Sequence, residues 1–314
     1  MADDDKFQLV VNPPQERWNE MVVQCLEDEG WKQSFDDYRC FLDGYGEENV
    51  KFVVAIDKET DKMAACVCGV LFPSVDGSPE VFTIGLYYTH PDFRGTGLGM
   101  RVFNKVTEFA KGKNMFLNAV EDMSQKYADV GFDKLGDWDM HILGAAMKDM
   151  NITKLKVDSD LKIVDFKDVD FAKLAAYDKE IGGGVVRAVF LKKWLTQKQT
   201  WNKFAVDDSG KVLGFCSVKI VHGDNALLGP FYADSVNVAS TLLRKTLEAV
   251  PDLKKYGRLM FFKSTNNVEG TAMFKGMVDG EWFDRSCPRQ FTKEVIKSPD
   301  HKIYAIAEAM TSFY

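Results

Sequence analysis

The stretch that decides the fold is His90-Pro91-Asp92-Phe93-Arg94-Gly95-Thr96-Gly97-Leu98-Gly99-Met100-Arg101. The nine residues before it, 81–89, are mostly apolar, aromatic or β-branched and predict a buried strand. After it, apolar residues recur at helical spacing, at Val102, Phe103, Val106, Phe109 and Ala110. The stretch therefore joins a strand to a helix through a turn that is rich in glycine and headed by an arginine.

This turn has the features of a phosphate-binding loop. Gly95, Gly97 and Gly99 have no side chains, so the backbone can turn tightly and bring its N–H groups up to an anion. The next helix directs its positive dipole end to the same place, and Arg94 can add a permanently charged donor. The alternative is an ordinary strand-to-helix turn whose glycines serve close packing. A Walker loop is excluded because no Lys-Ser or Lys-Thr pair follows the last glycine, and the even glycine spacing fits a Rossmann fingerprint poorly.

The turn resembles motif A of the GCN5-related N-acetyltransferases. That motif has an Arg or Gln, two variable residues flanking a Gly, and then Gly and Gly or Ala, after a strand that ends near a Pro. Arg94 to Gly99 fill this pattern, and Pro91 stands in the expected place. The resemblance continues through the short apolar strand 115–120 to Tyr127, four residues before a Gly-Phe pair. It covers one domain, from Phe7 to about Lys148.

The resemblance implies acyl transfer from acetyl-CoA to an amine, without a metal. It also implies that the strand at 87–89 carries a bulge and that the pantetheine pairs with its freed backbone groups like an added strand. The residues expected to hold the cofactor are Tyr88, Thr89, Arg94, Gly95, Thr96, Gly97, Leu98, Gly99, Met100 and Asn118. For Asn118 a role as an edge-strand residue is the alternative. Tyr87 and Tyr88 should point to opposite faces of the sheet, so one can line the cleft while the other packs.

The expected reaction includes two proton transfers, one from the amine and one to the departing thiolate, and each needs a residue or water that takes or gives the proton. Deprotonating an alkylamine of pKa ~10.4 at pH 7 costs about 4.6 kcal/mol at ~1.36 kcal/mol per unit, so the site must desolvate the ammonium or supply a base. Tyr127 is the candidate general acid for the departing thiolate, a role that a Tyr here commonly has in the family. The alternative is that Tyr127 only packs on the sheet.

The base is less well defined by the sequence. Glu121 is a candidate, with Asp122 beside it, since both follow the strand next to the expected thioester; alternatively they cap a helix. His90 precedes a proline in a turn and is expected at the surface, and His141 is expected to be a core histidine. Many family members hold a Glu on the central strand, but residues 82–89 contain none, which favours a water chain.

The second half repeats the plan of the first. Strands at 203–207 and 212–218 lead to Leu228-Gly229-Pro230-Phe231-Tyr232-Ala233, which parallels 84–89, and an amphipathic helix follows. At the place of the glycine loop the second copy reads Asp234-Ser235-Val236-Asn237-Val238-Ala239-Ser240, with neither Arg nor Gly. We therefore expect a second domain that kept the fold and lost the pyrophosphate site.

The predicted fold is α/β with mixed sheets: two tandem domains, 1–150 and 151–314, each a mostly antiparallel twisted sheet flanked by helices. The segment 229–234 and the late segment 303–307 resemble, more narrowly, tandem acetyltransferases whose C-terminal half is of the type named after YitH and HolE. The substrates of that group are diverse, so this resemblance does not identify the acceptor.

Composition restricts the remaining possibilities. The 314 residues are 46% apolar and 28% charged, no apolar run is long enough for a membrane span, and the start is acidic, so we expect a cytoplasmic protein without membrane contact. The formal charge of −7 argues against nucleic-acid binding and is compatible with an amine substrate. The six cysteines lack metal-ligand spacing and are expected to be reduced.

The leading hypothesis is an N-acetyltransferase acting on a small amine. The alternatives are a non-catalytic acyl-CoA-binding module, in which the second domain is a dimerisation surface, and a protein-lysine acetyltransferase.

Overall fold

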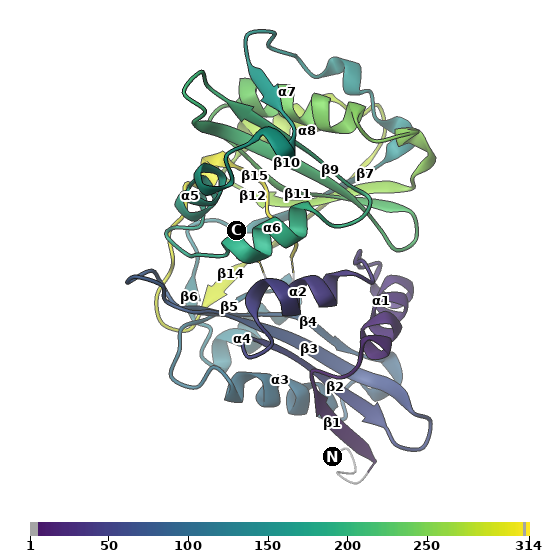
Figure 1. Ribbon diagram of the computed structural model, residues 1–314. Coiled ribbons are helices and arrows are strands. Elements are labelled where there is room, and N and C mark those ends of the chain that lie inside the picture. The colour runs from purple at the N-terminus through teal and green to yellow at the C-terminus, as the bar shows by residue number, and fades with distance from the viewer. Residues whose placement is uncertain (1–5, 310–311) are drawn as a thin grey trace.

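The structure is a computed structural model that describes residues 6–309 and 312–314, and two β-sheets organise it (Figure 1). The first sheet has the strand order β1 (Phe7–Val11), β2 (Val50–Asp57), β3 (Lys62–Phe72), β4 (Val81–Thr89), β5 (Met115–Asn118), β14 (Arg289–Phe291) and β6 (Lys134–Leu135). The second has the order β13 (Trp282–Cys287), β7 (Met140–Ala146), β12 (Arg258–Ser264), β11 (Asn225–Ala233), β10 (Val212–Val221), β9 (Thr200–Val206) and β8 (Lys162–Val164). A further strand, β15 (Ile303–Ala305), pairs with β11.

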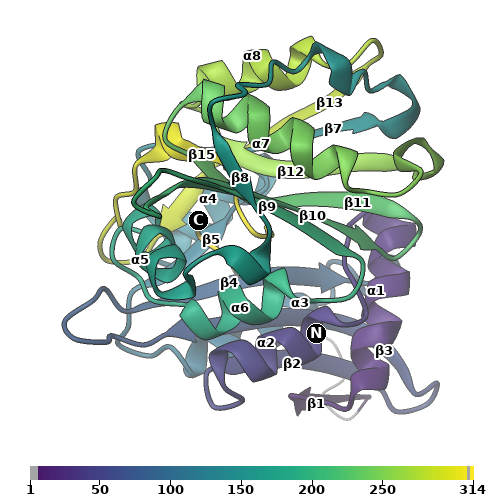
Figure 2. The same ribbon diagram turned by 45° about the horizontal axis from the view of Figure 1, so that its top comes forward.

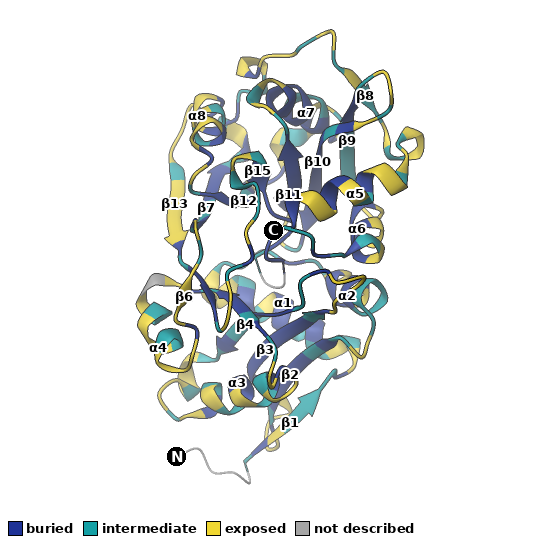
Figure 3. Cartoon of the chain, turned by 90° about the vertical axis from the view of Figure 1, so that its left-hand side faces the viewer, coloured by how far each residue is buried: buried dark blue, intermediate teal, exposed yellow. Residues whose placement is uncertain are grey.

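Helices cover both faces of each sheet, which makes a layered molecule (Figure 2). α3 (Leu98–Glu108) and α4 (Ser124–Asp129) lie on the outer side of the first sheet, and α7 (Val236–Glu248) and α8 (Val268–Gly276) on the outer side of the second (Figures 1 and 3). Between the sheets lie α1 (Gln15–Glu29), α2 (Asp37–Tyr45), α5 (Phe171–Ile181) and α6 (Ala188–Leu195). The fold class predicted from the sequence, two mixed sheets of mostly antiparallel strands flanked by helices, is confirmed.

The apolar side chains follow these layers. One core lies between α3 and the first sheet, where Leu98, Val102, Phe103 and Val106 recur at helical spacing and are buried. A second core lies under α7 and α8, and the largest lies between the two sheets. In that central core α2 and α6 pack closely, with Tyr45 stacked on Phe190 at 4.4 Å between ring centroids. Figure 3 shows this central region as buried.

The two halves exchange strands, which the division at residue 150 did not anticipate. β7 was expected in the first domain, but it lies in the second sheet, antiparallel to both β12 and β13. In return β14, from the C-terminal half, enters the first sheet between β5 and β6. Backbone hydrogen bonding accounts for the exchange. Both strands that pair with β7 come from the second half, and both strands that pair with β14 come from the first half. A cut at residue 150 would remove one strand from each sheet.

A buried ion pair also connects the halves. Lys219 on β10 meets Asp37 at the start of α2 with a Nζ–Oδ1 distance of 2.5 Å, and both side chains are 1% exposed. Asp37 also accepts a hydrogen bond from the Ser34 amide at 2.8 Å, and the Lys219 ammonium lies 3.3 Å from the centroid of the Trp194 ring. Both charges are therefore compensated inside the core.

We expect Lys219→Met to lower the free energy of unfolding by about 3–5 kcal/mol, because it leaves the Asp37 carboxylate buried without its cation. Lys105→Met is the matched control, since Lys105 pairs with Glu108 on the surface of α3, where such pairs contribute about 0–1 kcal/mol. Urea unfolding measures both variants. Equal losses in the two would show that the central pair is not essential to the interface.

Candidate functional site

The glycine loop lies where the sequence placed it, between β4 and α3. A short 3-10 turn, Pro91–Phe93, follows β4, and α3 begins at Leu98 directly after Gly97, its N-cap residue. The amides of the first turn of a helix have no carbonyl partner within that helix. The loop and the start of α3 therefore present N–H donors at the positive end of the helix dipole, which suits a pyrophosphate.

Glycine is required at the three loop positions for two different structural reasons. Gly95 and Gly97 have φ angles of +76° and +91°, a region that other residues rarely adopt, and no atom lies within 4 Å of where their Cβ atoms would be. Gly99 is helical, but a Cβ there would lie 2.7 Å from Thr89 Oγ1 and 2.8 Å from the Tyr87 hydroxyl. The first two glycines thus shape an open loop, and the third lets α3 approach β4.

Arg94 is held in place by the end of α1. Its Nε donates to the Thr89 carbonyl at 3.0 Å, and its Nη2 donates to Glu29 at 2.6 Å. The guanidinium is half exposed beside the loop. It therefore keeps surface for an anion, while Glu29 neutralises part of its charge when the loop is empty.

The expected bulge is present in β4. The pairing of β3 with β4 shifts between Cys66 and Cys68, and Leu86 has a φ of +51° at the irregularity. β4 pairs in parallel with β5 only as far as Ile84, which lies opposite Leu117. Beyond this point the two strands separate, and the backbone of 86–89 has no partner on β5.

The bulge decides which tyrosine faces the loop. Tyr87 packs on Phe103 of α3, with its hydroxyl beside Gly99. Tyr88 points to the opposite face, between the sheets, where it is 3% exposed and donates a hydrogen bond to Asp28 of α1. Of the predicted cofactor residues, Tyr88 can thus contribute its backbone but not its side chain on the loop side. Tyr87, whose orientation the sequence left open, takes that place.

Tyr127 lies on the same side as the loop. Its ring, on α4, is 5.8 Å from Phe103 and 6.5 Å from Tyr87, measured between centroids. Burial raises the pKa of the Tyr127 phenol, and the nearby Tyr87 hydroxyl adds to the effect. The phenol therefore keeps its proton at neutral and moderately alkaline pH, as a proton donor requires.

Asn118 ends β5 where the strands separate. Its side-chain Nδ2 donates to the Ala309 carbonyl at 3.4 Å, while its Oδ1 is buried and has no hydrogen-bond partner among the described residues. The segment after β15 thus passes the open end of the slot. It brings with it Glu308, a 1% exposed carboxylate that the sequence pattern did not single out.

The other base candidates lie elsewhere. The side chain of Glu121 is outside the described part of the structure, and Asp122 is exposed. His90 accepts a hydrogen bond from the Asp92 amide at the rim of the loop, as expected of a surface residue. His141 was expected in the core, but it contacts Asp284 near the edge of the second sheet, away from the loop.

In the second half, the slot that corresponds to the β4–β5 opening is filled. β11 has the same kind of irregularity as β4, at Gly229 and Pro230, and pairs in parallel with β12 as far as Leu228 opposite Phe261. Beyond that point β15 pairs with β11, and the Ile306 amide donates to the Phe262 carbonyl of β12 at 2.7 Å. The protein's own strand therefore occupies this slot.

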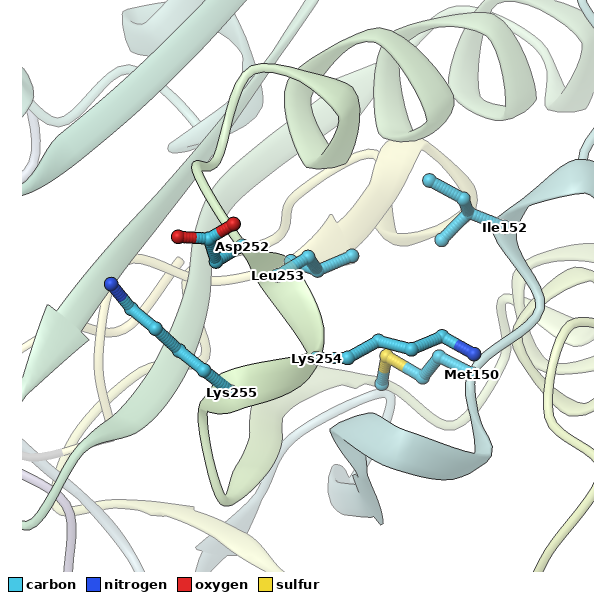
Figure 4. A pocket seen from close by; sticks show the side chains of 6 residues that line it. All are labelled: Met150, Ile152, Asp252, Leu253, Lys254 and Lys255. Carbon is cyan, nitrogen blue, oxygen red and sulfur yellow. The ribbon is translucent and has the colours of Figure 1, made fainter.

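Two hollows are apparent at the surface. One, of about 770 Å³, runs along α1 past Asp28 and His90, next to the face on which Tyr88 lies. The other, of about 370 Å³, lies between Met150 and Ile152 on one side and Asp252–Lys255 on the other, in the second half (Figure 4). No residue of the candidate site lines the second hollow. In the described part of the chain, no helix has the length and apolar composition needed to span a bilayer.

Comparisons with known proteins agree with this geometry. Residues 15–132 match the acetyltransferase (GNAT) family, and residues 174–254 match a second acetyltransferase (GNAT) domain. No curated protein sequence matches the chain.

Among solved structures, a putative acetyltransferase from Pyrococcus horikoshii is similar over 99% of this chain and 98% of its own, with a TM-score of 0.72 at 15% identity. A tandem GNAT protein from the clavulanic acid biosynthesis pathway matches over 91% of this chain and 98% of its own, with a TM-score of 0.64 at 13% identity. N-myristoyltransferase from Saccharomyces cerevisiae, with bound myristoyl-CoA, matches over 98% of this chain and 90% of its own, with a TM-score of 0.62 at 9% identity. At these identities the likeness shows the fold alone.

We expect Gly97→Ala to lower the free energy of unfolding by about 1–2 kcal/mol, because a Cβ is disfavoured at a φ of +91° although the space around it is open. Gly276→Ala is the control: this glycine is in α8, has an open Cβ position and no positive φ, so alanine should be neutral or stabilising by up to about 1 kcal/mol. Urea unfolding compares the two variants. If both change the free energy of unfolding alike, the loop conformation does not depend on glycine.

Proposed function

Because the chain belongs to the GNAT acetyltransferase family, with two such domains in one polypeptide, we propose that it transfers an acetyl group from acetyl-CoA to the primary amine of a small molecule. The proposal places one working site in the first half. The second half lacks the loop, and β15 occupies its slot.

One observation carries the proposal: the glycine loop at the start of α3 adjoins the backbone that the bulge in β4 frees from β5. A ligand that binds both needs an anionic end for the helix terminus and an amide-containing chain for the strand. The pyrophosphate and pantetheine of a coenzyme A thioester have this combination. Asn118, with its unpaired Oδ1, lies at the far end of the slot, where the thioester would be.

Two hydroxyl groups lie along this path. The Tyr87 hydroxyl is next to Gly99, within the loop region, and Tyr127 packs beside Tyr87 toward the opening of the slot. In the proposed reaction the amine attacks the thioester carbonyl and Tyr127 donates its proton to the departing thiolate.

A panel of amines and acyl-CoA donors tests the proposed function. Release of free thiol from acetyl-CoA with at least one amine is the expected result. The panel includes a polyamine, an amino sugar, an amino acid, an arylalkylamine and a lysine peptide, so it separates a small-molecule enzyme from a protein-lysine acetyltransferase. Tight acetyl-CoA binding without release by any amine would favour the non-catalytic binding module. Longer acyl-CoA donors belong in the same panel because a structure of the same fold holds myristoyl-CoA.

We expect the chain to bind one equivalent of acetyl-CoA, and Arg94→Ala to weaken that binding about 10-fold to 100-fold, the range of a lost charge-assisted hydrogen bond. Isothermal titration calorimetry measures both quantities. Arg39→Ala is the control, because Arg39 is an exposed arginine of α2. Two equivalents per chain, or an unchanged affinity in Arg94→Ala, would refute the site assignment.

We expect Tyr127→Phe to lower kcat about 100-fold with little change in the KM for acetyl-CoA, because it removes a proton donor and keeps the ring packing. Burial raises the pKa of Tyr127, so the wild-type phenol stays protonated as the pH rises past the ordinary value of ~10. A pH–rate profile of the wild-type enzyme should accordingly show no loss of activity from this group up to about pH 10. A variant with wild-type kcat would assign Tyr127 to packing alone.

A further inference from the structure

The proposed reaction requires a proton acceptor, and β4 does not supply one. Residues 82–89 contain no carboxylate, and His90 lies at the rim of the loop. An alkylammonium ion must nevertheless lose a proton before its nitrogen can attack a carbonyl group. The inference below rests on the proposed function and concerns the group that takes this proton.

One hydrogen bond of the neighbouring residue and one electrostatic interaction place Glu308 close to the central strands. The residue after it, Ala309, accepts a hydrogen bond from Asn118 of β5, one position beyond the Leu117–Ile84 pair. On the other side lies Cys68 of β3, whose thiol pKa is raised by burial and by the Glu308 carboxylate. Cys68 is opposite Gly85 in the ladder. Glu308 therefore lies between the end of β5 and the part of β3 that pairs with Gly85, close to the place where β4 leaves β5.

The segment that carries Glu308 is fixed at many points. Glu308 Oε1 accepts a hydrogen bond from the Ser312 amide at 2.5 Å. Farther along, Arg289 of β14 donates to the Phe313 carbonyl at 2.6 Å and stacks at 3.6 Å on the Trp138 ring. Arg187 donates to the Tyr314 carbonyl at 3.1 Å. Both arginines are buried, and Arg289 lies on β14 of the first sheet, so the segment is tied to that sheet as well as to the residue before α6.

Besides the Ser312 amide, which donates to Glu308, the described surroundings of this carboxylate include a further acceptor. Asn118 Oδ1 is buried and unpaired among the described residues, and it lies on the same face of the sheet, toward the second half. The nearby ionisable groups are Cys68 and Tyr232, whose pKa values are raised by burial, and the Arg187–Asp178 ion pair, which is internally compensated. An ammonium group, with three N–H donors, matches this pair of acceptors.

We propose that Glu308 is the proton acceptor for the attacking amine, with Asn118 Oδ1 as a second hydrogen-bond acceptor that orients it. The ammonium gives one proton to the Glu308 carboxylate, directly or through water, and the nitrogen lone pair then forms the C–N bond with the acetyl carbonyl carbon. As the C–S bond breaks, the thiolate takes the proton of Tyr127, and the phenol regains a proton from the nitrogen. Glu308 returns its proton to solvent, which balances the reaction at one proton released per amide formed.

A rival acceptor is Asp28, which receives a hydrogen bond from Tyr88 on the same side of the first sheet. Asp28 is exposed at the end of α1, whereas Glu308 is buried over the slot. Asp28→Asn therefore belongs in the test as the competing hypothesis.

The test compares amines of different basicity. It uses the full chain, the best amine found in the panel, and the β-difluorinated analogue of that amine, at about pH 8.5, where the fluorinated amine is mostly unprotonated and the ordinary amine is still mostly protonated. Glu308→Gln keeps an oxygen for the Ser312 amide and removes the base. We expect it to lower kcat for the ordinary amine about 100-fold to 1,000-fold, to lower kcat for the fluorinated amine less than about fivefold, and to leave acetyl-CoA affinity unchanged. Glu294→Gln, at an exposed glutamate of the C-terminal part, is the matched control with wild-type kcat.

Each outcome decides the question. Glu308→Gln with wild-type kcat for the ordinary amine, or Asp28→Asn with the larger loss, overturns the assignment to Glu308. Equal losses for both amines assign Glu308 a structural role and also overturn it. If Glu308→Gln does not bind acetyl-CoA, Glu308→Asp replaces it, and a loss confined to the ordinary amine is again the supporting result. Wild-type protein that binds acetyl-CoA but acetylates no amine refutes the proposed function itself, and the role of Glu308 with it.

Discussion

The separation of β4 from β5 is the constraint on which the rest of the structure depends. A strand in the middle of a sheet must satisfy its N–H and C=O groups on both sides, and β4 stops doing so on one side after Ile84. The irregularity at Leu86 turns the backbone there and leaves 86–89 without a strand partner on the β5 side, next to the glycine loop. Such groups are costly when buried unless a ligand, a strand or water pairs with them. In the function proposed here a ligand pairs with these groups in the first half, so the break in the hydrogen-bonding ladder becomes a binding site.

In the second half, the backbone groups at the corresponding position are paired with another strand of the protein instead of being left unpaired. Its β11 also has an irregularity and also leaves the neighbouring parallel strand, but β15 fills the gap and completes the hydrogen bonding. The missing glycine loop and the filled slot are therefore two independent reasons to place the proposed coenzyme site in the first half alone. The strand that closes the second slot leads into a segment that contacts Asn118 of β5, so the half without a loop still contributes residues next to the slot of the first half.

The sequence alone predicted those elements whose conformation depends mainly on residues close together in the chain. The strand–loop–helix unit, the glycines with positive φ and the helix of Tyr127 all follow from residues close together in the chain. The side-chain direction of Tyr87 and Tyr88 could not be fixed, because the bulge at Leu86 interrupts the period of two on which such assignments rest. The exchange of β7 and β14 could not be predicted either. Both segments read as ordinary strands, and their partners are more than 100 residues away.

Glu308 was missed for the same physical reason. Nothing in the local sequence distinguishes it from the surface glutamates; only its position between the sheets, fixed by Asn118, Ser312 and the buried arginines, does so. A carboxylate on β4 itself would be limited to the positions that the pleat offers, and the bulge disturbs these. A separate segment that meets the first sheet at Asn118 can bring a carboxylate close to the slot without altering β4, the strand proposed to bind the coenzyme. The strand exchange between the halves makes this arrangement stable, because the segment is held between two sheets that cannot separate without losing strands.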